Sequence, residues 1–168
     1  MADPQIKSPM DHWDYLTVIL YRCGFTLAAI MTALLPYKPE IAHYGILIAA
    51  TLCASSLHIY LKNIRLLLQM ATWVALICQL FNLPEFALGG ALLTLGGLAF
   101  KEYFCFRVFA LNLQPFFVAI LWLSLQFNLT YMVYILSVVS AVLFLMVSIQ
   151  KWRMPLHFDI GDKRKYQL

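Results

Sequence analysis

Charged residues are scarce in this chain. They make up 12% of the sequence and hydrophobic residues 62%, whereas soluble domains contain about 25% and 45–50% of these classes. This composition excludes a soluble globular protein and predicts an all-α, polytopic membrane helical bundle. At about 20 apolar residues per span, 168 residues leave room for about six transmembrane helices and for no separate soluble domain.

The chain also lacks the motifs of soluble enzymes and redox proteins. Its cysteines form no C-x-x-C pair and all lie in apolar segments, so we expect buried, inert thiols at Cys23, Cys53, Cys78 and Cys105. It contains no Rossmann or P-loop phosphate motif and no nucleophile elbow. We therefore favour a protein that is not an enzyme and that carries no cofactor.

Two histidine patterns resemble metal or haem sites but are incomplete. His43 and His58 lie in one apolar segment about 22 Å apart at the rise of an α-helix, yet the other histidines lie outside the apolar segments, which argues against bis-histidine haem. Cys105 and His58 alone are two ligands short of a closed tetrahedral metal site. The sequence therefore predicts no metal.

Six apolar segments follow one another along the chain. Proline and asparagine residues separate them, and they cover residues 15–35, 41–61, 64–81, 86–106, 115–128 and 131–152. We thus predict a cytoplasmic N-terminal segment at 1–14, a six-helix transmembrane domain at 15–152 and a basic cytoplasmic tail at 153–168. The fifth segment is short for a span.

The basic residues indicate the topology. With the N-terminus in the cytoplasm, nearly all lysines and arginines fall on the cytoplasmic side and only Lys38 falls on the other, as the positive-inside rule requires. Both ends of the chain are then cytoplasmic. The formal charge of +4 is explained by this topology and does not indicate nucleic acid. We expect the polar tail to be solvated and mobile, in contact with anionic lipid.

Small residues in membrane helices mark faces that contact other helices. In the fourth segment such residues recur at spacings of three and four from Ala87 to Gly97, and Lys101 and Cys105 continue the stripe. We therefore expect Lys101 to point into the bundle with Glu102 on its flank. The same reasoning predicts one inward-facing polar cluster in the cytoplasmic half of the membrane, formed by Arg22, His58, Gln69, Lys101 and Glu102.

The cluster has two interpretations. In the first, Arg22 and Glu102 form a structural ion pair while Lys101 extends along its methylene stem to the interface. In the second, two cations against one carboxylate leave positive charge for an anionic ligand, a lipid headgroup or a quinone carbonyl, and His58 adds a donor that titrates near neutral pH.

Two short blocks of the sequence resemble a family of small bacterial integral membrane proteins known as a domain of unknown function. They are residues 97–107 (G-L-A-F-K-E-Y-F-C-F-R) and 112–115 (N-L-Q-P). The resemblance implies a polytopic protein of the bacterial cytoplasmic (inner) membrane. It also points to Lys101, Glu102, Cys105 and Arg107 as the residues most typical of the family. It implies no particular activity, ligand or cofactor.

Two functions therefore compete, with a membrane enzyme that acts on lipid or quinone ranked after them. In one, the cluster binds or transports a small anionic or amphipathic solute, with membrane lipids and a quinone as further ligand classes. In the other, the protein is an assembly or accessory subunit of a larger membrane complex, and the charges lock its own helices or those of partner subunits.

Overall fold

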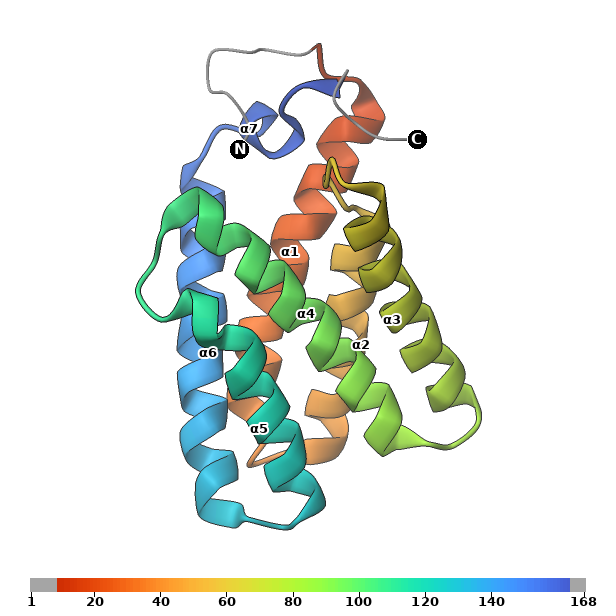
Figure 1. The fold of residues 1–168 in the computed structure, drawn as a ribbon, viewed down its shortest axis with the longest axis vertical. Coiled ribbons are helices and arrows are strands. Elements are labelled where there is room, and N and C mark those ends of the chain that lie inside the picture. Colours follow the sequence, from red (N-terminus) through yellow and green to blue (C-terminus); the bar gives the residue numbers. More distant parts are fainter. Residues whose placement is uncertain (1–8, 164–168) are drawn as a thin grey trace.

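The computed structural model describes residues 9–163 of the chain. Within this range all regular secondary structure is helical (Figure 1), which confirms the predicted all-α fold. The elements are α1 (His12–Leu34), α2 (Pro39–Ser55), α3 (Lys62–Leu80), α4 (Pro84–Phe106), a short 3-10 helix η1 (Leu111–Leu113), α5 (Gln114–Gln126), α6 (Thr130–Arg153) and α7 (His157–Ile160). Five of the six predicted apolar segments match a helix to within three residues at each end. The second prediction, 41–61, is too long, because α2 ends at Ser55 and His58 lies in the connection to α3.

Proline and asparagine set several helix boundaries. Pro39, Pro84 and Pro115 lie in the first turns of α2, α4 and α5, where a missing backbone N–H costs no hydrogen bond. Asn82 and Asn128 follow α3 and α5 with φ values of 56° and 54°, a left-handed conformation that asparagine tolerates better than most residues. The predicted breaks between segments are therefore confirmed at these positions.

Within residues 9–163, three helices, α1, α3 and α6, are long and apolar enough to cross a membrane. The helix α2 has 17 residues. The helix α5 has 13 residues, so it is about 20 Å long, whereas the hydrocarbon core of a bilayer is about 30 Å thick. That all six helices cross the membrane stays a prediction.

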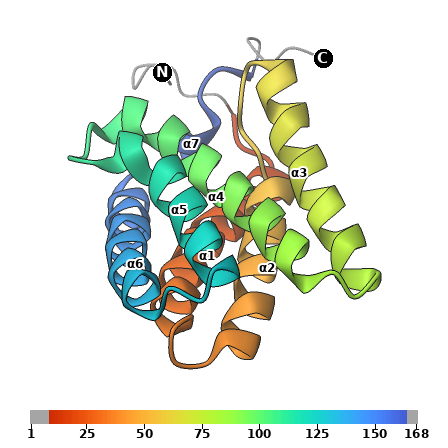
Figure 2. The same ribbon diagram turned by 60° about the horizontal axis from the view of Figure 1, so that its bottom comes forward.

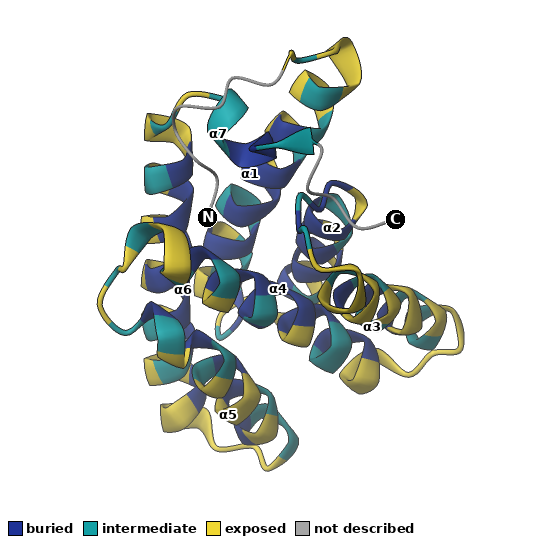
Figure 3. Cartoon of the chain, turned by 45° about the horizontal axis from the view of Figure 1, so that its top comes forward, coloured by how far each residue is buried: buried dark blue, intermediate teal, exposed yellow. Residues whose placement is uncertain are grey.

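Helices α1 and α4 hold the bundle together. The first packs against α2 and α6, and the second against α2, α3 and α5 (Figures 1 and 2). Phe25 and Phe144 lie at the α1–α6 contact with ring centroids 6.3 Å apart, and both side chains are fully buried. The outward sides of α3 and α5 are exposed (Figure 3), as expected of apolar helices that face acyl chains.

The small-residue stripe of α4 forms helix contacts, as predicted. A Cβ atom at Gly90 would lie 2.9 Å from that of Ala75 and 3.0 Å from the backbone oxygen of Ala71, so only glycine permits this approach of α3. One turn further on, the hydroxyl oxygens of Thr72 and Thr94 are 2.9 Å apart across the same contact. Both threonines are buried, which places α4 firmly against α3.

The prediction of buried thiols is correct only for Cys53. Cys23 and Cys105 are exposed, and Cys78 is half-buried. Cys23 follows the buried Arg22, and one residue of α-helix rotates a side chain by about 100° away from its neighbour. Cys105 lies in the last turn of α4 beside Phe104, which is also exposed.

Candidate functional site

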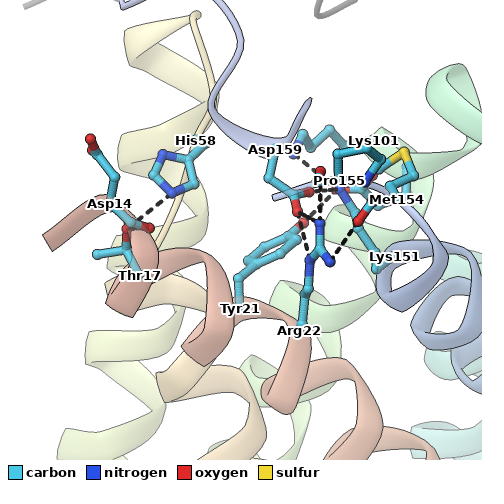
Figure 4. A network of polar contacts seen from close by, with 11 residues as sticks. Asp14, Thr17, Tyr21, Arg22, His58, Lys101, Lys151, Met154, Pro155 and Asp159 are labelled. Atoms are coloured by element: carbon cyan, nitrogen blue, oxygen red, sulfur yellow. Dashed lines mark hydrogen bonds and ion pairs between the residues drawn. The ribbon is translucent and has the colours of Figure 1, made fainter. Parts of the chain in front are cut away.

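Five charged side chains meet at the end of the bundle where α1 begins and α4 and α6 end (Figure 4). They come from four helices: Arg22 from α1, Lys101 and Glu102 from α4, Lys151 from α6 and Asp159 from α7. We call these five residues the ionic network.

Arg22 is fixed by the chain that follows α6. Its Nε and Nη2 atoms donate to Asp159 Oδ2 at 2.8 and 2.5 Å, and its Nη1 and Nη2 atoms donate to the carbonyl oxygens of Met154 and Pro155 at 3.0 and 3.2 Å. Its side chain is 2% exposed. A buried guanidinium is tolerated only with such a set of acceptors.

Lys151 joins the two carboxylates. Its Nζ atom lies 2.5 Å from Asp159 Oδ1 and 2.8 Å from Glu102 Oε2. The other oxygen of Glu102, Oε1, accepts hydrogen bonds from the Tyr21 hydroxyl at 2.7 Å and from Lys101 Nζ at 2.9 Å. Both carboxylates are therefore neutralised within the protein.

The network carries three cations and two carboxylates, so its formal charge is +1. The side chains of Arg22, Glu102, Lys151 and Asp159 are at most 4% exposed, whereas that of Lys101 is 27% exposed. Lys101 is thus the cation of the network that another molecule can reach.

A cavity of about 560 Å³ adjoins the network. Its polar lining is His58, Lys101, Lys151 and Asp159; its other lining residues are Ile59, Tyr60, Leu61, Ile64, Gly97, Phe100, Phe104, Cys105, Met154, Phe158 and Ile160. Among these, Leu61, Ile64, Phe100 and Phe104 are exposed. The cavity therefore opens to the outside between the start of α3 and the end of α4.

His58 lies in the connection between α2 and α3, at the cavity wall. Its Nε2 atom is 3.2 Å from the hydroxyl of Thr17 (Figure 4). Burial, together with the positive charge of Lys101, lowers the pKa of His58 to about 4, and Asp159 and Asp14 offset this only in part. The expectation that His58 titrates near neutral pH is therefore wrong, and it is a neutral lining residue there.

Residues 154–163 fold back across the network and close it from outside. We call this segment the C-terminal strap. The backbone N–H of Asp162 donates to the Tyr60 hydroxyl at 2.9 Å, and Lys163 Nζ lies 2.5 Å from Asp14 Oδ2. This hydrogen bond to Asp14 raises the pKa of Lys163. The prediction of a solvated tail is thus wrong for the strap; residues 164–168 lie outside the described range.

Three predicted residues, Arg22, Lys101 and Glu102, do come together, but their roles differ from the expectation. The predicted Arg22–Glu102 ion pair is wrong, because Arg22 bonds to Asp159 and Glu102 to both lysines. Lys101 does reach inward, since its Nζ atom contacts Glu102 and the Tyr21 ring, but Glu102 is the residue of the two that is fully buried. It continues the buried face of α4 through Leu95 and Leu98.

The other predicted residues lie at or beyond the edge of the network. Cys105 lines the cavity. Gln69 does not join the cluster, because its amide donates to the Ala54 carbonyl at 3.3 Å and ties α3 to α2. Arg107 caps α4 with φ 49°; it is exposed, and within residues 9–163 it forms no ion pair.

Sequence reasoning missed Tyr21, Lys151 and Asp159. Lys151 carries a signal that could have identified it, since the inward face of α6 repeats at spacings of three and four. The buried residues of that face are Ser137, Ser140, Phe144, Ser148 and Lys151. Asp159 has no such signal, because it follows the last long helix in a polar stretch.

The arrangement offers positive charge beside an apolar cavity, which is the chemistry of anion binding. Among the described residues, no group of three or more His, Cys, Asp and Glu side chains is placed to hold a metal ion.

Comparison with known proteins places these features in a family. The sequence profile of DUF2301, described as an uncharacterized integral membrane protein, matches residues 76–168. A Haemophilus influenzae protein, described as an uncharacterized protein, is 62% identical over 168 residues, with 100% of both chains covered. No solved structure matches the chain. The profile covers more than half of the chain and includes four residues of the ionic network, which confirms the resemblance seen in the sequence: the chain belongs to the DUF2301 family of integral membrane proteins.

Proposed function

We propose that this protein is a multi-pass protein of the bacterial inner membrane that binds an amphipathic anion in the cavity beside the ionic network. The observation that carries the proposal is the position of Lys101. Its ammonium group shares one carboxylate, that of Glu102, with Lys151, and it is partly exposed at the cavity wall. A cation that is only partly neutralised attracts an anionic group.

The size and lining of the cavity suit a ligand that is apolar over most of its surface. Its volume of about 560 Å³ lies within the usual range of about 300–1,000 Å³ for ligand pockets. Phe100, Phe104 and Ile64 stand at its opening with 41–52% of their surfaces exposed. Acyl chains could pass this opening from the bilayer while the headgroup stays beside Lys101.

The positions of the charges support a cytoplasmic location for this site. The network lies at the same end as the start of α1 and the end of α6 (Figure 1), and the positive-inside rule assigns that end to the cytoplasm. An anionic amphiphile would then enter from the inner leaflet.

The proposal can be tested with the purified full-length protein in detergent micelles. The probe is a dansyl-labelled undecanoic acid, and dansyl-labelled undecanol serves as the neutral analogue. We expect saturable binding of the acid and much weaker binding of the alcohol. Lys101→Gln should weaken binding of the acid about tenfold, since a hydrogen bond to a charged group contributes about 1.5–3 kcal/mol.

Arg107→Gln is the matched control. It removes one positive charge from the end of the same helix but lies outside the cavity lining, so binding should not change. Equal binding of acid and alcohol by the wild type would overturn the proposal. Loss of a co-purifying membrane protein in Lys101→Gln, with no effect on the probe, would favour the accessory-subunit interpretation.

A further inference from the structure

We infer that Arg22 and Lys151 form a carboxylate subsite, and that Asp159 is a tethered occupant which the carboxylate of the ligand displaces. The inference rests on the proposed function and specifies the ligand: a long-chain amphiphile with one carboxylate, such as a fatty acid. It also makes the C-terminal strap the element that opens and closes the site.

The geometry at Asp159 defines what the subsite accepts. One oxygen, Oδ2, receives the Nε and Nη2 donors of Arg22, and the other, Oδ1, faces Lys151 Nζ. The two cations thus each hold one of the two oxygens of a single carboxylate. Arginine favours such planar oxyanions because its donors form a rigid fork.

The subsite is continuous with the cavity. Lys151 and Asp159 both line the cavity, as does Lys101. An amphiphile in the cavity therefore has its polar end within reach of the position that Asp159 holds. The strap forms part of this wall through Phe158, Asp159 and Ile160.

Contacts at the far end of the strap keep Asp159 in place. The Asp162 N–H bonds to the Tyr60 hydroxyl, and Lys163 pairs with Asp14 at the start of α1. Neither contact includes a member of the ionic network. The strap can therefore be loosened by substitution while all five charges of the network stay in the protein.

Competition between strap and ligand has a quantitative consequence. When binding requires an open state, the apparent dissociation constant rises in inverse proportion to the fraction of molecules that are open. Removing the two far contacts by Tyr60→Phe with Lys163→Ala should raise that fraction, and so should tighten probe binding about fivefold, which corresponds to about 1 kcal/mol.

The experiment measures binding of dansyl-labelled undecanoic acid to the full-length wild type, to the Tyr60→Phe and Lys163→Ala double variant, and to Asp159→Asn. Tyr131→Phe, which removes an exposed tyrosine hydroxyl at the start of α6, is the control. Hydrogen–deuterium exchange of residues 154–163, with and without the probe, provides a second readout. We expect tighter binding in both strap variants, no change in the control, and faster exchange of the strap when the probe binds.

The results separate this inference from the proposed function. The inference is wrong, and the proposed function stands, if both strap variants bind the probe only as tightly as the wild type does and the probe leaves hydrogen–deuterium exchange of residues 154–163 unchanged. If no variant binds the probe, Asp159→Asn included, the proposed function fails and the inference fails with it.

Discussion

Arg22 and Asp159 are separated by 137 positions in the sequence and form a buried ion pair with a shortest distance of 2.5 Å. The pair joins the first helix of the bundle to the last. Because Asp159 also contacts Lys151, and Lys151 contacts Glu102, one continuous set of ion pairs connects α1, α7, α6 and α4. The closure of the bundle at this end therefore depends on charges, whereas the other buried side chains of residues 9–163 are uncharged.

Glu102→Gln should destabilise the protein strongly. Glu102 is fully buried between Lys101, Lys151 and Tyr21, and removing one partner of a buried ion pair costs about 3–5 kcal/mol because the remaining charge stays buried. Thermal unfolding in detergent should show a clearly lower midpoint. Glu85→Gln, an exposed change in the first turn of the same helix, should cost less than about 1 kcal/mol. Equal midpoints for the two variants would contradict this prediction.

The helices could be predicted from the sequence because their signals are local. Apolar runs bounded by Pro39, Pro84, Pro115, Asn82 and Asn128 are visible without any knowledge of packing, and the helices begin and end near those residues. The same holds for the small residues of α4, because close helix packing in a membrane requires them.

The partners within the site could not be predicted in the same way. Which carboxylate Arg22 contacts depends on how the chain after α6 turns, and periodicity says nothing about an irregular segment. Asp159 lies in a charged stretch near the C-terminus, which is typical of solvated tails. Glu102 and Lys101 are adjacent, so periodicity alone could not decide which of the two is fully buried.

Arg22→Lys should loosen the strap even though it keeps the charge. One ammonium group cannot reproduce the guanidinium contacts to Asp159, Met154 and Pro155. We expect a loss of about 1–3 kcal/mol in the free energy of unfolding and faster hydrogen–deuterium exchange of residues 154–163. Arg153→Lys, an exposed change at the end of α6, should change neither. A strap that exchanges as slowly as in the wild type would show that charge alone holds it.

Two glycines at the α1–α2 contact should respond differently to alanine. A Cβ atom at Gly24 would overlap Cys53 Sγ and lie 3.0 Å from the backbone oxygen of Ala49, whereas one at Gly45 would overlap only the side chain of Met31. Methionine can adopt another rotamer, but the backbone cannot move without shifting a helix. Gly24→Ala should therefore lower stability by about 1–3 kcal/mol and Gly45→Ala by less, as measured by thermal unfolding. The reverse order would mean that α2 shifts more easily than Met31.

His58 should make the protein less stable as the pH falls. Its pKa is about 4 in the folded protein, chiefly because of burial, against a reference value of 6.5. Between these two values the unfolded chain binds more protons than the folded one, so the free energy of unfolding increases with pH across this window.

In His58→Gln this contribution to the pH dependence of stability is absent. The variant should therefore lose less stability than the wild type when thermal unfolding is compared at about pH 7 and about pH 5. His12→Gln controls for the loss of an exposed imidazole. Equal losses in His58→Gln and wild type would show that His58 gains a proton in the folded protein as easily as in the unfolded chain, which the burial beside Lys101 should prevent.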